Sequence, residues 1–318
     1  MSCLGRGGLW HRATAVLGGI RRPGIQPGDA RRPCLVIGHR GAAKLEVENT
    51  LASFRRALEL GADTIETDLS ATADGRFALW HDADPDESIA LARQLGAEGL
   101  AYRPRVPEVG SHWRRPVREL RAVELAQHYG YESEGDGEPK TFAGIEWLED
   151  LLEWVRQARL AHVFLDIKLS DAETGAAEDL VARLRRESRG ATVFHLLCPR
   201  GPIVRALAAA CSGDGSEHLH VSADLELPAP PVTELTATGA RDVSLGLGGR
   251  VWPGYRYDVG RMLRARDSGA FERVVGWTIN DRRRLEMLVG AGVDGLLTDE
   301  PALLRAIVEA AGRGSGRG

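Results

Sequence analysis

A strand-like apolar run followed by a helix-like amphipathic run recurs along most of this chain, and this alternation constrains the fold most strongly. CLVIGH (34–39), for example, precedes ENTLASFRRALELGA (48–62), whose apolar residues recur at helical spacing. Eight strand–helix units predict an α/β protein, a closed parallel (β/α)8 TIM barrel over residues 34–310, and a doubly wound open sheet is the alternative. The eight predicted strands are 34–39, 64–69, 77–81, 163–168, 192–197, 219–222, 274–279 and 294–298.

Two stretches do not fit the alternation. DVSLGL (242–247) would make a ninth strand, so we interpret it as a short extra strand or a loop. Residues 83–140 are far longer than a usual strand-to-helix loop, and they predict an insertion subdomain after the third strand that shapes the barrel entrance. From Arg103 to Arg118 this segment has five arginines and one acid, Glu108, which favours attraction of an anionic substrate; a solvated surface excursion is the alternative.

The two ends of the chain differ in composition from the rest. Residues 1–33 contain six arginines and one acid, Asp29, and predict a disordered basic leader, with an organellar transit peptide as the second interpretation. Residues 311–318 are rich in glycine and arginine and predict a disordered tail. The expected location is therefore cytoplasmic, or an organelle if the leader is a transit peptide.

Composition excludes several classes of protein. The formal net charge of −4 argues against a general nucleic-acid binder. No apolar run approaches 18 residues, so stable membrane insertion is not expected. The four cysteines form no CxxC pair, which predicts free thiols in a reducing compartment. The oligomeric state is left open.

Charged or titratable residues collect at the carboxyl ends of four predicted strands, where buried barrel strands are usually apolar. They are His39-Arg40, Glu66 with Asp68, His81-Asp82, and Asp166 with Lys168. Residues two apart on a strand point to the same side, so Glu66, Asp68 and Asp166 are expected to converge at the barrel mouth. Carboxylates buried together repel, and a bound divalent cation, Mg²⁺ or Ca²⁺ for an all-oxygen set, removes that penalty.

The basic residues at the same strand ends predict a phosphate site. Arg40 offers a planar fork and Lys168 a point charge to phosphate oxygens. His39 and His81 complete a phosphoryl-transfer set, because imidazole can deprotonate an attacking oxygen or protonate a leaving one near neutral pH. Which histidine is the acid and which the base stays open.

Five motifs give the chain a family resemblance: GHRGA…ENTLASFRRALELGADTIETDL (38–69), TADGRFALWHD (72–82), FLDIK (164–168), VVGWTIND (274–281) and AGVDGLLTDEP (291–301). With them, the chain resembles the glycerophosphodiester phosphodiesterases, which are (β/α)8 barrels with an insertion after the third strand. The resemblance implies hydrolysis of a small-molecule glycerophosphodiester to sn-glycerol 3-phosphate and an alcohol. It implies that His39 and His81 are the acid–base pair and that Trp277 lies near the glycerol side of the pocket. The implied ligands of Mg²⁺ or Ca²⁺ are Glu66, Asp68 and Asp166, and the implied phosphate contacts are Arg40 and Lys168.

The sequence departs from the family pattern in three places. Asp166 stands where the third metal acid is often glutamate, Val47 replaces a usual proline, and ADPDESIALARQ (83–94) lacks an expected Arg-Thr-Thr-Gly pattern, which leaves the head group open. Glu48 and Asn49 are interpreted as supporting residues, with helix capping as the alternative. Asp299 is interpreted as a turn former before Pro301.

The same barrel is compatible with two other functions. A lysophospholipase D-like enzyme would expose an apolar groove in the insertion, whereas residues 83–118 are mostly polar and basic. A non-catalytic phosphate-binding barrel would lack a histidine or a metal acid, and all are present.

Overall fold

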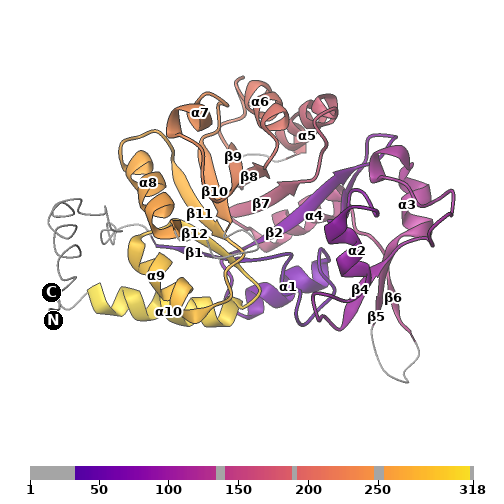
Figure 1. Ribbon diagram of the computed structural model, residues 1–318, viewed down its shortest axis with the longest axis horizontal. Coiled ribbons are helices and arrows are strands. Elements are labelled where there is room, and N and C mark those ends of the chain that lie inside the picture. The colour runs from indigo at the N-terminus through magenta and orange to yellow at the C-terminus, as the bar shows by residue number, and fades with distance from the viewer. Residues whose placement is uncertain (1–32, 134–139, 188–191, 247–253, 316–318) are drawn as a thin grey trace, which may run out of the picture.

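Eight parallel strands close into a barrel in the computed structural model, which describes residues 33–133, 140–187, 192–246 and 254–315. β1 pairs with both β2 and β12, and these pairings close the ring (Figure 1). The predicted TIM barrel is therefore confirmed. In spatial order the barrel strands are β1 (Leu35–Gly38), β2 (Thr64–Ala71), β7 (His162–Ile167), β8 (Val193–Cys198), β9 (Leu219–Glu226), β10 (Asp242–Gly246), β11 (Arg273–Trp277) and β12 (Gly295–Thr298).

The membership of the barrel differs from the prediction in two strands. The run predicted at 77–81 forms β3 (Phe77–Leu79), which pairs antiparallel with β2 outside the closed ring. The turn at Asp74-Gly75, with Gly75 at φ 77°, joins β2 to β3 as a hairpin, and so short a connection cannot make a parallel crossover. Residues 242–246 of DVSLGL, the run interpreted as an extra strand or loop, instead form β10, which is buried between β9 and β11. Because one predicted strand leaves the ring and one uncounted strand joins it, the predicted number of eight barrel strands is still correct.

Helices follow the barrel strands in chain order and pack around the outside of the ring (Figure 1). They are α1 (Leu51–Glu59), α4 (Leu148–Ala158), α5 (Thr174–Glu187), α6 (Gly201–Ala210), α7 (Val232–Thr236), α8 (Tyr255–Asp267), α9 (Arg282–Ala291) and α10 (Pro301–Ser315). The predicted tail at 311–318 is wrong in its first part, because α10 continues through Ser315. Residues 316–318 and 1–32 of the predicted leader lie outside the described residues.

The segment between β3 and α4 contributes a second, antiparallel sheet beside the barrel (Figure 1). The sheet has its own core, in which Trp80 contacts Tyr129 and Tyr131 at ring-centroid distances of 6.2 and 5.0 Å. The segment is thus anchored through the end of β3. Its elements are α2 (Ser88–Gln94), β4 (Tyr102–Arg105), the short helix η1 (Val117–Glu119), α3 (Ala122–His128), β5 (Gly130–Ser133) and β6 (Phe142–Ala143).

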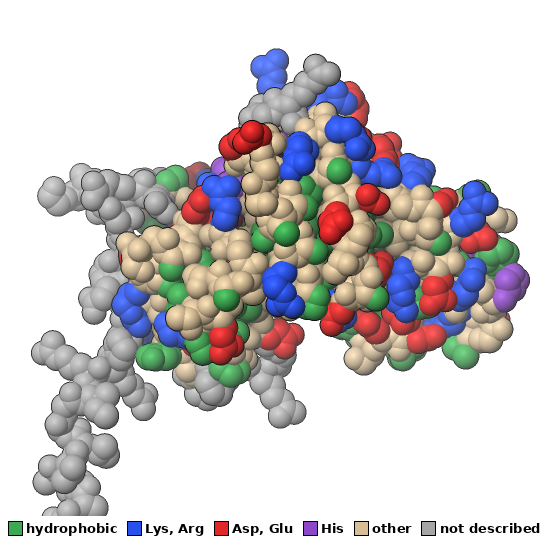
Figure 2. Space-filling model, turned by 90° about the horizontal axis from the view of Figure 1, so that it is seen from above, with side chains coloured by type: hydrophobic (Ala, Val, Ile, Leu, Met, Phe, Trp, Pro, Cys, Tyr) green, Lys and Arg blue, Asp and Glu red, His purple; other side chains and the backbone are tan. Residues whose placement is uncertain are grey.

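The arginines of this segment mostly face acidic partners. Arg103 donates to Glu132 at 2.8 Å and Arg114 to Asp86 at 2.7 Å. On the face seen in Figure 2, basic and acidic side chains are interspersed over the segment. Arg118 is the residue of the predicted basic stretch that reaches the main cavity.

The barrel interior is built in layers, because alternate residues of every strand point inward. A middle layer is apolar and consists of Ile37, Phe164, Leu197, Val275 and Leu297. Toward the carboxyl ends of the strands the interior is polar and opens into the cavity described below. Toward the amino ends it is polar again, with three histidines and an aspartate.

Two predictions from composition can be compared with the described residues. Cys34, Cys198 and Cys211 are free thiols, as predicted. Among the helices of the described ranges, none has both the length and the apolar character needed to cross a bilayer.

Candidate active site

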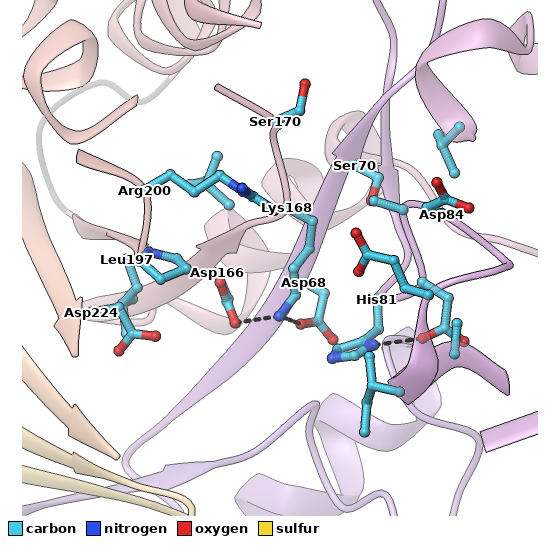
Figure 3. Close-up of a pocket in the computed structure, with 18 of the residues that line it drawn as sticks. Asp68, Ser70, His81, Asp84, Asp166, Lys168, Ser170, Leu197, Arg200 and Asp224 are labelled. Carbon is cyan, nitrogen blue, oxygen red and sulfur yellow. Dashed lines mark hydrogen bonds and ion pairs between the residues drawn. The ribbon is translucent and has the colours of Figure 1, made fainter. Parts of the chain in front are cut away.

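The main cavity opens at the carboxyl ends of the barrel strands and has a volume of about 610 Å³ (Figure 3). Eight residues predicted from strand ends and from the family resemblance line it together, although they come from four barrel strands and the hairpin. Glu48 and Asn49 contact these residues from outside the lining. The eight are His39, Arg40, Glu66, Asp68, His81, Asp166, Lys168 and Trp277.

Glu66, Asp68 and Asp166 form one carboxylate cluster, in which the ligand atoms offered by the three residues lie within 4.8 Å of one another. Asp68 of β2 stands beside Asp166 of β7 in the sheet register, so the shorter third acid still reaches the cluster. Burial and the charge of Asp68 raise the pKa of Glu66 to about 8. Asp166 Oδ1 is buried and has no hydrogen-bond partner within the described part of the chain. A buried all-oxygen set with an unsatisfied oxygen fits a hard divalent cation.

Lys168 lies between two of these carboxylates. Its Nζ is 2.6 Å from Asp166 Oδ2 and 3.1 Å from Asp68 Oδ1 (Figure 3). Burial opposes the charge of Lys168, but Asp166 and Asp68 outweigh burial and raise its pKa. The ammonium group therefore neutralises part of the cluster in the ligand-free chain.

Arg40 is held by carboxylates on several sides and is only 8% exposed. Its backbone N–H donates to Glu66 Oε2 at 2.9 Å, and its Nη1 donates to Glu48 Oε2 at 2.8 Å. Its Nε lies 3.2 Å from Asp68 Oδ2. Glu48, which is fully buried, also accepts from Arg93. Glu48 thus fixes the guanidinium group of Arg40 at the cavity wall.

Asn49 positions Asp68 rather than a histidine. Its Nδ2 donates to Asp68 Oδ2 at 2.9 Å, and its Oδ1 accepts from the backbone N–H of Asp68 at 3.1 Å. The capping alternative for Glu48 and Asn49 is wrong, because Thr50 is the N-cap of α1 and accepts from the Ser53 N–H at 3.2 Å.

Each cavity histidine is paired with a carboxylate through Nδ1. His39 Nδ1 is 2.7 Å from Asp299 Oδ1, and His81 Nδ1 is 2.6 Å from Asp82 Oδ1. An ionised carboxylate only accepts, so the hydrogen-bond pattern assigns the Nδ1 proton to each neutral ring. Nε2 of each imidazole is then the nitrogen that can exchange a proton with a ligand.

The surroundings shift the two histidines in opposite directions. Burial and the charge of Arg40 lower the pKa of His39, but Asp299 outweighs them and the pKa is raised from its ordinary value. Burial and the positive charges of Arg40 and Lys168 hold the pKa of His81 well below its ordinary value. His39 is therefore the ring that keeps a second proton more readily.

Several residues that line the cavity or contact its lining were missed or misinterpreted from the sequence. Asp299 is not only a turn former, because it accepts from His39 and from Asn280 Nδ2 at 2.5 Å. Arg93 binds Asp82, the partner of His81, at 3.2 Å. Asp224 of β9 also lines the cavity (Figure 3). Asp224 lies two residues after the predicted strand 219–222, so the strand-end pattern used for the other acids could have found it.

The packing of α1 explains why residue 41 is a glycine. Its φ is 85°, and a Cβ there would lie 2.4 Å from Ser53 Oγ and 2.7 Å from the Ser53 carbonyl carbon. The glycine therefore lets the turn after β1 pack against α1, which brings Arg40 to the cavity wall.

Comparison with known proteins finds a family to which part of the chain is similar. The sequence model of the Glycerophosphoryl diester phosphodiesterase family matches residues 39–189, which include both cavity histidines and the carboxylate cluster. This segment, just under half of the chain, is therefore similar to that family. A glycerophosphodiester phosphodiesterase of Caldanaerobacter subterraneus is 52% identical over 54 residues, 17% of this chain and 22% of that protein. One of Bacillus subtilis is 26% identical over 154 residues, 48% of this chain and 46% of that protein. The chain thus matches less than half the length of these two relatives of the family.

Solved structures of the family share the fold beyond the matched segment. An Oleispira antarctica phosphodiesterase, solved in complex with the product sn-glycerol-3-phosphate, superposes with a TM-score of 0.64 at 17% identity. The superposition covers 87% of this chain and 97% of that one. At this identity the likeness concerns the barrel fold.

Proposed function

We propose that this protein hydrolyses small glycerophosphodiesters to sn-glycerol 3-phosphate and an alcohol, with the help of a divalent cation. The observation that carries the proposal is the grouping of three carboxylates, two cationic side chains and two carboxylate-paired histidines in one cavity. The product named for the Oleispira antarctica relative and the names of the curated relatives support the substrate class.

Glu66, Asp68 and Asp166 would hold the cation, Mg²⁺ or Ca²⁺. When bound, the ion supplies positive charge that stabilises the negative charge developing on the phosphoryl oxygens. Lys168 and Arg40 contact the phosphate in this proposal. Lys168 can turn to phosphate because a cation that neutralises Asp68 and Asp166 removes the reason for its present pairing.

The opposite pKa shifts assign different proton roles to the two histidines. We assign His81, which stays neutral, as the base that takes a proton from the attacking oxygen at Nε2. His39, which holds its second proton more readily, is the acid that protonates the leaving alkoxide. The P–O bond to the leaving alcohol breaks as the new P–O bond forms. At the end of the reaction His81 has gained a proton and His39 has lost one. Solvent exchange then restores both rings.

Trp277 is proposed to contact the glycerol end of the substrate. Its indole lies over Gly246, where a Cβ would come within 2.4 Å of the ring. The side chain is half-buried and lines the cavity, which leaves one part of the indole for a ligand. Glu48 and Asn49 are proposed as positioning residues, through Arg40 and Asp68 respectively.

The proposal is tested with a substrate panel. The full chain is incubated with Mg²⁺ or Ca²⁺ and with one of four substrates: glycerophosphocholine, glycerophosphoethanolamine, glycerophosphoinositol or a lysophospholipid. Both sn-glycerol 3-phosphate and the released head-group alcohol are measured enzymatically, because a lysophospholipid would release the alcohol but no sn-glycerol 3-phosphate. Release of sn-glycerol 3-phosphate from at least one glycerophosphodiester is expected. Turnover of the lysophospholipid alone would support the lysophospholipase D-like alternative instead.

A further inference from the structure

A second group of titratable residues lies inside the barrel, below the apolar middle layer and away from the cavity. His195 of β8, His220 of β9 and Asp242 of β10 offer ligand atoms that lie within 4.8 Å of one another. They are 0%, 7% and 1% exposed. His195 and His220 are register partners on neighbouring strands, so the sheet itself holds the two imidazoles side by side. The proposed reaction uses none of the three.

The contacts within this histidine–aspartate cluster leave polar atoms unsatisfied. Asp242 Oδ2 accepts from His195 Nδ1 at 2.9 Å and lies 3.5 Å from His220 Nδ1. Within the described ranges, His220 Nδ1 and Asp242 Oδ1 have no hydrogen-bond partner, although both are buried. Buried polar atoms are normally paired, and each unpaired one calls for a physical account.

The described groups around the cluster leave Asp242 without a lysine or arginine as partner. Among the ion pairs of the described residues, those of Asp242 join it to His195 and His220, and none joins it to Arg273 of β11. Glu272 lies 3.7 Å from His220 Nδ1 and pairs with Arg241 at 2.6 Å. A bound cation would supply the positive charge that this buried carboxylate lacks.

The outer contacts resemble those that orient metal-binding histidines. A ligating imidazole usually has its other nitrogen fixed by a hydrogen bond. His195 Nε2 lies 3.2 Å from His162 Nδ1, and Phe164 stacks on the His195 ring at a centroid distance of 4.3 Å. His195 Nδ1 is thereby fixed toward Asp242 and His220.

We propose that His195, His220 and Asp242 form a second metal site, which binds a divalent transition-metal ion such as Zn²⁺ or Co²⁺. Two imidazoles and one carboxylate suit these ions, whereas Mg²⁺ and Ca²⁺ prefer the all-oxygen cluster at the cavity. The site is structural in position: the layer of Phe164 and Leu197 separates it from the cavity, and it ties β8, β9 and β10 together. Bound metal therefore stabilises the fold without touching substrate.

The experiment uses the full chain, treated with chelator and then kept in excess Mg²⁺ so that the cavity cluster prefers that ion. Co²⁺ is titrated, and visible absorption reports its coordination, since nitrogen ligands in a four- or five-coordinate site give much stronger bands than an all-oxygen octahedral site. The expected result is one Co²⁺ per chain with a strong band, and a rise in the thermal unfolding midpoint on adding Zn²⁺.

Variants locate the ion. His220→Gln, at the more accessible edge of the cluster, should abolish the band, and His162→Ala should weaken binding about 10- to 100-fold by freeing the far nitrogen of His195. His112→Ala, on the segment outside the barrel, and Asp68→Asn, in the cavity, should both keep the band. Circular dichroism checks that each variant is folded.

Two outcomes overturn the proposal. One is wild-type protein that binds no Co²⁺ in excess Mg²⁺, a result that depends on no variant. The other is a band that persists in folded His220→Gln and disappears in Asp68→Asn, which would place the ion in the cavity.

Discussion

His39 Nδ1 lies 2.7 Å from Asp299 Oδ1, although the two residues are 260 positions apart in the chain. The ring closure of β1 on β12 makes this contact, since His39 follows β1 and Asp299 follows β12. Asn280 holds the other carboxylate oxygen of Asp299. The Asp299 carboxylate thus stabilises the proton on His39, and it reaches His39 because β1 pairs with β12.

Replacing Asp299 should change the pH dependence of turnover. Asp299→Asn removes the charge that raises the pKa of His39, so the pKa falls. A general acid must be protonated, so kcat/KM declines as pH rises through that pKa, and this basic limb should move to lower pH. At pH 7 we expect a loss of roughly 100-fold or more, as for other carboxylates that orient a catalytic imidazole.

The pH–rate profile of kcat/KM measures this shift. Glu300→Gln is the matched control, because Glu300 is the next residue but pairs with Lys44 at the surface. A basic limb that stays in place in Asp299→Asn would show that His39 is not the acid.

Removing either cavity histidine should abolish most of the activity. His39→Ala and His81→Ala each delete one proton-transfer group, worth about 10²- to 10⁴-fold in kcat. Turnover of glycerophosphocholine is measured together with circular dichroism, and His128→Ala on α3 serves as the control. Near-normal turnover by either folded cavity variant contradicts the acid–base assignment.

The buried position of Glu48 predicts a large loss of stability in Glu48→Gln. The substitution leaves Arg40 and Arg93 with one carboxylate fewer in a site where Glu48 is fully buried. Breaking such a pair costs about 3–5 kcal/mol of unfolding free energy. Urea denaturation measures it. Glu59→Gln, which removes the exposed partner of Arg56, should cost less than about 1 kcal/mol, and equal losses in the two variants would argue against the role of Glu48.

The contact of Trp277 with Gly246 predicts a change in substrate binding. Gly246→Ala places a Cβ within 2.4 Å of the indole, so the ring must move from its position in the cavity. KM for glycerophosphocholine should rise with a smaller change in kcat. Gly290→Ala on α9, where a Cβ meets nothing within 4 Å, is the control. An unchanged KM in Gly246→Ala would contradict the proposed contact between Trp277 and the glycerol end of the substrate.

The sequence predicted the barrel and the cavity residues because both depend on local pattern. Apolar runs identify buried strands, and polar residues at their carboxyl ends meet at one face of any parallel barrel. The pattern could not distinguish β3 from β10: both are short runs, and only the hairpin pairing of β3 with β2 removes β3 from the ring. Whether a strand belongs to the closed sheet depends on which strands it pairs with, and the sequence of one strand alone does not specify its partners.

The partners of the cavity residues were harder to predict than the residues themselves. Arg93 lies on α2, in the long excursion, and reaches Glu48 and Asp82 only after that segment folds back over the barrel mouth. Asp299 precedes a proline, and that local context is typical of a turn. Its contact with His39 depends on ring closure. Contacts between distant segments carry no periodic signal in the sequence.

The most direct measurement of the central proposal follows sn-glycerol 3-phosphate release from glycerophosphocholine by the chelator-treated chain, before and after Mg²⁺ or Ca²⁺ is added. The carboxylate cluster predicts no product without an ion, product when either ion suits the site, and none from His81→Ala in any condition. Full release of product by metal-free protein would contradict the account, as would the absence of product from wild-type protein with every glycerophosphodiester and both ions.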